Sequence, residues 1–192
     1  MTQKYALLPI VLVLLVSQSL QANQPVPCQI SVTGGQTSIC QGQPLVLIGQ
    51  TALEADEVSR QLWETNGKLL SDNGNNFTRL DTSTPGSYVV TYKVWDATGN
   101  ENSCTVKIEV AGPPEFEIVE NFGFFQRILF KKPMPRLRIL SEESHTFQWF
   151  LNGNEISGAS EAVYKPSAAG KYSVKVTSQQ GCSAFSKDII VD

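Results

Sequence analysis

The chain has 192 residues, with 15 Lys or Arg, 18 Asp or Glu and one His, which gives a formal net charge of −3 and a pI of about 5.2. This mild acidity argues against binding nucleic acid through overall charge, and the hydrophobic content of 41% argues against a disordered chain. A single His leaves no room for a multi-histidine metal centre. We therefore predict no metal and no cofactor. The length allows one medium domain or two small ones.

Residues 1–22 are predicted to be a secretory signal peptide. Lys4 precedes a twelve-residue apolar run, 5–16, and polar residues then lead to Ala22. The run is shorter than the roughly 20 apolar residues that cross a bilayer. No comparable run follows, so we expect a mature protein without a transmembrane span. It would be secreted, exposed on the cell envelope or periplasmic, where disulfides persist.

The remaining chain contains an internal repeat. The pattern W-x-x-N-G-x-x-[LI]-S begins at Trp63 and again at Trp149, and G-x-Y-x-V begins at Gly86 and again at Gly170. The two offsets, 86 and 84 residues, are nearly equal. We therefore predict two tandem domains, 23–111 and 112–192, joined at a Gly-Pro-Pro segment that cannot continue a strand.

Each copy has the pattern of an antiparallel β-sandwich. Asn-Gly in both copies predicts a tight hairpin, because such a turn needs positive φ at both central residues. A later strand alternates apolar and polar positions, which indicates that one face is buried. Further strands are predicted at 44–48, 104–110, 115–119, 136–140 and 186–191. Strands of this length in units of 80 to 90 residues are typical of an all-β sandwich fold.

The repeated aromatic residues have two interpretations. Trp63 and Trp149 are candidate platforms for sugar stacking, but in a sandwich the tryptophan at this position normally lies in the core. Tyr88 and Tyr172 each follow a Gly at the start of a late strand, where a tyrosine hydroxyl bonds upstream backbone. We therefore assign all four residues to the structural core.

Both copies resemble known extracellular modules. Residues 84–100, T-P-G-S-Y-V-V-T-Y-K-V-W-D-A-T-G-N, resemble the end of a PKD domain or of the related HYR module. Residues 148–153, 170–176 and 181–184 are similar to immunoglobulin-like repeats of surface proteins from Bacteroidota-type bacteria. The resemblance implies tandem immunoglobulin-like or PKD-like sandwiches. It specifies little about function, because such modules serve as spacers, adhesive units and platforms.

The four cysteines are divided three to one between the copies. Cys28, Cys40 and Cys104 lie in the first copy and Cys182 in the second, so three pairings exist. The HYR resemblance implies a bond between Cys28 and Cys104, whereas the bacterial immunoglobulin-like resemblance implies one between Cys40 and Cys104. Cys182 is then free, bonded to the remaining first-copy cysteine, or bonded to another protein. No C-x-x-C spacing suggests zinc.

One basic stretch is a candidate binding site. Between residues 121 and 141 there is no acidic residue, and phenylalanines alternate with five cations, Arg127, Lys131, Lys132, Arg136 and Arg138. Such cations could hold the sulfate, phosphate or carboxylate of a glycan or lipid headgroup. The alternative is that they are the solvated face of the first strands of the second sandwich, where Lys also protects an edge.

These observations predict a protein without catalytic apparatus. We expect a secreted or surface-bound binding or adhesion protein that contacts carbohydrate or matrix through loops at the ends of its sandwiches. The alternative from another class is a structural or spacer subunit of a bacterial envelope complex. The expected partners are accordingly a glycan, a matrix component or an envelope protein, and not nucleic acid.

Overall fold

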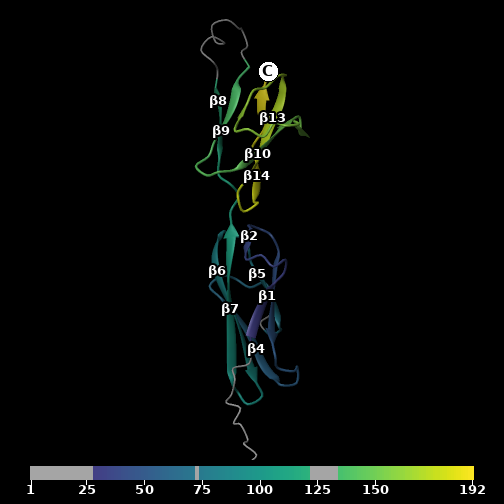
Figure 1. Ribbon diagram of the computed structural model, residues 1–192, viewed down its shortest axis with the longest axis vertical. Coiled ribbons are helices and arrows are strands. Elements are labelled where there is room, and N and C mark those ends of the chain that lie inside the picture. Colours follow the sequence, from purple (N-terminus) through teal and green to yellow (C-terminus); the bar gives the residue numbers. More distant parts are fainter. Residues whose placement is uncertain (1–27, 72–73, 122–133) are drawn as a thin grey trace, which may run out of the picture.

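The computed structural model describes residues 28–71, 74–121 and 134–192, and the regular elements there are all β-strands. The predicted signal peptide, 1–22, lies outside the described residues. The strands form two sandwiches that follow one another along the long axis of the molecule (Figure 1). The predicted all-β class and the tandem sandwich arrangement are confirmed.

The first sandwich packs a three-stranded sheet against a four-stranded sheet. Its strands are β1 (Cys28–Val32), β2 (Ser38–Cys40), β3 (Leu45–Thr51), β4 (Val58–Thr65), β5 (Phe77–Leu80), β6 (Gly86–Asp96) and β7 (Glu101–Ala111). The sheet orders are β1-β3-β5 and β2-β7-β6-β4. Neighbouring strands are antiparallel except that β2 runs parallel to β7. This parallel pair places Cys40 opposite Ala111, at the last residue of β7.

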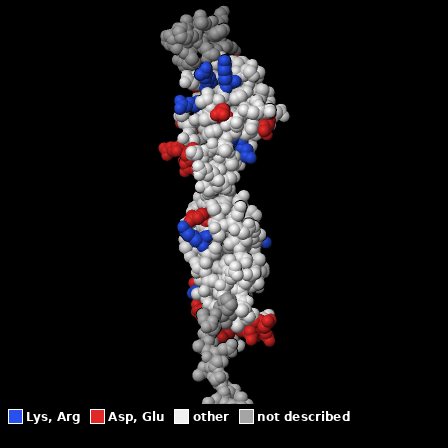
Figure 2. Space-filling model, in the orientation of Figure 1, with Lys and Arg blue, Asp and Glu red and all other residues white. Residues whose placement is uncertain are grey.

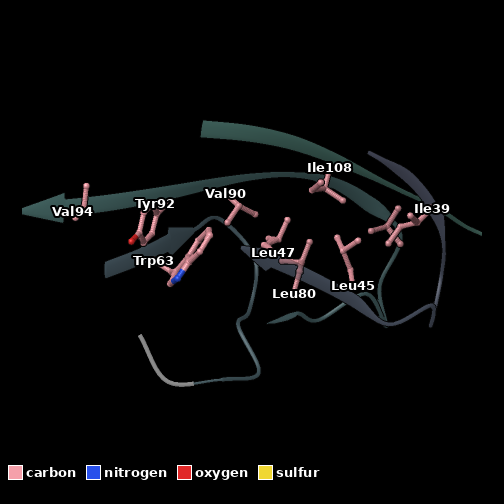
Figure 3. Packing of buried hydrophobic residues seen from close by; sticks show 10 residues of the cluster. Ile39, Leu45, Leu47, Trp63, Leu80, Val90, Tyr92, Val94 and Ile108 are labelled. Atoms are coloured by element: carbon pink, nitrogen blue, oxygen red, sulfur yellow. The ribbon is translucent and has the colours of Figure 1, made fainter. Parts of the chain in front are cut away.

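Alternation along the strands supplies the core between these sheets. In β6, Val90, Tyr92 and Val94 are buried, and the residues between them are more exposed. Figure 3 shows Val90 beside Leu47 of the opposing sheet and Tyr92 beside Trp63. The Trp63 ring lies 4.7 Å from the Tyr92 ring, centroid to centroid. The predicted period of two therefore corresponds to one buried strand face.

The second sandwich repeats this plan with shorter strands. They are β8 (Glu117–Asn121), β9 (Arg136–Leu140), β10 (Thr146–Leu151), β11 (Asn154–Glu155), β12 (Val163–Tyr164), β13 (Gly170–Thr177), β14 (Ser183–Phe185) and β15 (Ile189–Val191). One sheet has the order β12-β9-β8, and the other β11-β10-β13-β14, with β15 also paired to β13. Trp149, Tyr172, Val174 and Val176 are fully buried between them.

The hairpin prediction is right in the second domain and wrong in the first. Asn152 and Gly153 have φ of 50° and 80° and connect β10 to β11 as a two-residue turn. At Asn66 the chain instead leaves the sheet of β4 and crosses to the other sheet, where Leu69 pairs with Leu80. Gly67 has no positive φ, but a Cβ there would lie 2.5 Å from the Tyr88 ring. In this copy Gly67 is therefore needed so that the backbone can pack against the Tyr88 ring, and not for a turn.

The strand predicted at 186–191 is shorter than expected: only β15 (Ile189–Val191) falls in it, and a separate strand, β14 (Ser183–Phe185), precedes it. β14 pairs with the end of β13 and β15 with its beginning. Between them, Ser186 replaces a regular ladder contact: its Oγ accepts from Val174 N at 3.0 Å, and its N donates to Val174 O at 2.9 Å. The break therefore leaves the backbone of β13 hydrogen-bonded while the last strand changes course.

Candidate functional site

The repeated tryptophans belong to the two cores. Trp63 is 1% exposed and Trp149 is fully buried. Each indole N–H donates to a carbonyl twelve residues further along the chain, Trp63 to Asn75 O at 3.0 Å and Trp149 to Glu161 O at 2.9 Å. With the ring packed and its one donor used, neither side chain presents a face for stacking on a sugar.

The repeated tyrosines have matching hydrogen bonds. Tyr88 donates to Thr84 O at 2.8 Å, and Tyr172 donates to Ala168 O at 2.9 Å, in both cases four residues upstream. Tyr172 is fully buried, whereas Tyr88 is half-buried. These bonds fasten the turn that leads into β6 and into β13, as in a tyrosine corner.

The cysteines form one bond inside the first domain and one between the domains. Cys28 is joined to Cys104, linking β1 to β7 across the two sheets, with Cα atoms 5.5 Å apart. Cys40 is joined to Cys182, in the turn before β14, with Cα atoms 5.4 Å apart. The first is the pairing implied by the HYR resemblance. The Cys40 to Cys104 pairing does not form, because Cys40 stands beside Ala111, seven residues along β7 from Cys104.

The bond between the domains should restrict their relative motion. We expect the Cys40→Ala/Cys182→Ala variant to retain both folded domains, because neither cysteine is needed to close a sheet. The domains of the variant should then tumble more independently, which ¹⁵N relaxation measured separately in each domain would detect. The oxidised wild-type protein serves as the control. Identical anisotropic tumbling of variant and oxidised wild type would show that the linker alone fixes the domain orientation.

The predicted basic stretch is only partly within the described residues. Arg127, Lys131 and Lys132 lie outside them. Arg136 and Arg138 are on β9, both exposed, and alternate with the buried Leu137 and Ile139. Figure 2 shows basic side chains on the second domain, toward its end away from the first domain. The two arginines thus occupy a solvated strand face, where their guanidinium groups are accessible to a ligand.

One acidic side chain, Asp96, organises the turn between β6 and β7 in the first domain. Asp96 accepts from Thr98 N and Oγ1 at 2.8 and 2.7 Å, and from Asn100 N and Nδ2 at 2.9 and 2.8 Å. The Thr98 hydroxyl and the Asn100 amide are the main reasons why the pKa of this carboxyl falls to about 2. The Asp96 carboxylate therefore caps the β6–β7 turn and has its acceptor positions largely occupied.

A pocket lies where the linker enters the second domain. It has a volume of about 360 Å³ and is lined by the linker (111–115), the β9–β10 loop and the β13–β14 turn. The residues of the two loops that face it are Ser141, Glu142, Glu143, His145, Ser178 and Gln180. Figure 2 shows acidic side chains on the part of the second domain next to the junction. Cys182 belongs to the same turn as Ser178, so the disulfide to Cys40 holds the β13–β14 turn, which forms one side of the pocket.

Inside this pocket a serine, a histidine and a glutamate come together. Ser141 Oγ lies 2.7 Å from His145 Nδ1, and His145 Nε2 lies 3.7 Å from Glu143 Oε2. The types match a hydrolytic triad, but the Ser141 hydroxyl is committed to backbone: it contacts Glu115 O at 3.5 Å and Glu143 O at 3.3 Å and accepts from Glu143 N at 3.4 Å. The hydroxyl thus stabilises the loop and the linker rather than standing free as a nucleophile.

Sequence reasoning missed this pocket, since the single His, His145, served there as an argument against a multi-histidine metal centre. The signal available was the run Ser141 to His145, S-E-E-S-H, between two predicted strands. Its proximity to the linker follows only from the domain junction, which no local pattern encodes. A second, more apolar groove of about 670 Å³ lies between β8 and the β14–β15 segment, lined in part by Phe116, Phe185 and Ile189.

Within 28–71, 74–121 and 134–192, no three His, Cys, Asp or Glu side chains are grouped so that they could hold a metal ion. In the same ranges, no helix has the length and apolar character needed to span a membrane.

Similarity to known proteins is confined to the fold. No family model matches the chain, and no curated protein matches its sequence. The structure is similar to the C-terminal 282-residue fragment of intimin in complex with the intimin-binding domain of its translocated receptor, with 13% identity and a TM-score of 0.55. It is also similar to the eight N-terminal Ig domains of Down syndrome cell adhesion molecule, with 13% identity and a TM-score of 0.51.

These matches cover most of this chain but only part of the other two. They cover 88% and 82% of this chain, whereas they span 64% of the intimin fragment and 26% of the adhesion-molecule fragment. Identity this low shows a shared architecture and nothing about ligands. The chain therefore has the fold of tandem immunoglobulin-like β-sandwiches.

Proposed function

We propose that this protein is an extracellular, non-catalytic binding protein whose two immunoglobulin-like domains act as one adhesive unit. The observation that carries the proposal is the bond between Cys40 and Cys182, which joins the domains covalently beside their linker. Both disulfides support an oxidising compartment, where such bonds persist. The resemblance to PKD, HYR and bacterial immunoglobulin-like modules supports the outer surface of a bacterial envelope as the location.

The ligand that fits best is an anionic glycan or matrix component. Arg136 and Arg138 present two guanidinium groups on one face of β9, and neither forms an ion pair within the described part of the chain. Guanidinium binds carboxylate and sulfate through paired, charge-assisted hydrogen bonds. Arg127, Lys131 and Lys132, which precede β9 in the sequence, would add to the same positive charge.

A glycan array that includes sulfated and carboxylated glycans tests this proposal. We expect binding that falls at least tenfold in the Arg136→Glu/Arg138→Glu variant, since each lost charge-assisted hydrogen bond is worth about 1.5 to 3 kcal/mol. Arg79→Glu is the matched control, because Arg79 is also exposed and lies between the buried Thr78 and Leu80 on β5. The control should bind as the wild type does.

Two outcomes would count against it. Equal loss in the Arg79→Glu control would mean that net charge, and not the β9 face, governs retention. Absence of glycan binding together with co-purification of an envelope protein would instead favour a structural or spacer subunit of an envelope complex.

A further inference from the structure

The junction pocket described above has an acidic lining. Glu115, Glu142 and Glu143 face it, and no Lys or Arg is among the described residues that line it. Within the described ranges, none of these three carboxylates forms an ion pair with a Lys or Arg. The described lining therefore has an excess of negative charge, and beside it Arg138 lines a neighbouring hollow together with Glu115 and Glu142.

The His145 imidazole lines the same pocket, and among the described residues one of its ring nitrogens is unpaired. Its side chain is 2% exposed, and within the described part of the chain Nε2 has no hydrogen-bond partner. Ser141 Oγ lies 2.7 Å from Nδ1, and either atom can be the donor; in the tautomer with its hydrogen on Nδ1, the hydroxyl donates to a backbone carbonyl. That assignment leaves Nε2 with a bare lone pair. A buried acceptor without a donor is costly, and native proteins rarely leave one unexplained.

In the tautomer with the hydrogen on Nδ1, Nε2 and the Glu143 carboxylate are two acceptors that face one another. They are 3.7 Å apart with no hydrogen between them in this tautomer. An N–H₂ or N–H₃⁺ group can donate to two acceptors at such a separation. The Glu143 side chain is 77% exposed, so it can turn to admit a group that would contact both atoms.

We infer that this pocket binds a guanidinium or alkylammonium group, presented as an Arg or Lys side chain of a partner protein. Glu143, Glu142 and Glu115 would pair with the cation, and His145 Nε2 would accept one of its hydrogens. The linker prolines, Pro113 and Pro114, would contact the aliphatic stem. A volume of about 360 Å³ accommodates one such side chain. This site adjoins the β9 face, since Arg138 lines a hollow with Glu115 and Glu142, but its probe is a cation and that of the β9 face is an anion, so either proposal can fail without the other.

The single histidine makes the test specific. The chain has one His, so one imidazole contributes ring signals to a ¹H–¹³C spectrum. Titration of the oxidised mature protein with Nα-acetyl-arginine methylamide, at one fixed and slightly alkaline pH, should shift these signals saturably in the millimolar range. Nα-acetyl-citrulline methylamide, which is isosteric but neutral, should give no saturable shift. Putrescine, titrated in parallel, separates a preference for a peptide side chain from one for free amines.

Two variants locate the response. Glu143→Gln should weaken binding of the arginine probe about tenfold, the loss expected for one charge-assisted hydrogen bond. Glu155→Gln, an exposed carboxylate on β11 outside the pocket, should bind as the wild type does. An equal response to the citrulline probe, equal affinity in the Glu143→Gln variant, or tighter binding of putrescine than of the arginine probe would overturn the inference.

Discussion

Replacing Cys28 and Cys104 by alanine should lower the free energy of unfolding of the first domain by about 4 kcal/mol. The bond joins residues separated by 76 positions, and opening so long a loop restores much chain entropy to the unfolded state. It also joins β1 to β7 in opposite sheets of a domain too small to bury a large core. Urea denaturation followed by circular dichroism measures the change.

The control for this measurement is the Cys40→Ala/Cys182→Ala variant. It too removes one disulfide, but its bond lies between the domains, so the first sandwich keeps its internal crosslink. We expect the first-domain transition of this control to move much less. If both variants shift that transition equally, the bond between the domains contributes to first-domain stability as much as the internal one.

Trp63→Ala should destabilise the first domain by roughly 3 to 5 kcal/mol, the usual cost of truncating a fully buried aromatic side chain. The substitution empties the space beside Tyr92 and leaves Asn75 O without its indole donor. Trp95→Ala provides the matched control in the same domain. Trp95 is only partly buried and contacts Arg60, whose guanidinium carbon lies 4.8 Å from the ring centroid.

The two tryptophan variants are compared by thermal unfolding followed by circular dichroism, which does not depend on indole fluorescence. We expect the Trp95→Ala transition to lie close to that of the wild type, because a half-exposed ring gives up less apolar burial. A Trp95→Ala loss as large as that of Trp63→Ala would mean that the contact with Arg60 stabilises the domain more than its exposure indicates.

The features that could be predicted from sequence are those that depend on local pattern. The alternation of apolar and polar residues predicted β6 and β13, because every second residue of a half-buried strand faces the core. The repeated W-x-x-N-G pattern predicted that Trp63 and Trp149 occupy equivalent core positions. Asn66 and Asn152 share the same dipeptide yet differ in outcome. The amide of Asn66 accepts from Val89 N at 2.8 Å, and that of Asn152 accepts from Lys171 N at 3.0 Å, so both asparagines bond the late strand although only the second forms a hairpin.

Features that depend on how two domains meet could not be predicted in this way. Nothing near Cys182 in the sequence identifies Cys40 as its partner, because their proximity arises from the parallel β2–β7 pair and the linker that follows it. The junction pocket has the same origin, since its walls come from the linker and from two loops of the second domain. The candidate cations that precede β9, Arg127, Lys131 and Lys132, lie outside the described residues, so their role stays a prediction.

Cys40 and Ala111 are paired across β2 and β7, so two covalent connections leave the first domain side by side. One is the peptide linker that begins after Ala111, and the other is the disulfide from Cys40 to Cys182. A protease that cuts the linker would therefore leave the two halves attached, and the nicked protein would migrate as one species until a reductant is added. Cleavage within the linker is thus not enough by itself to separate the two domains.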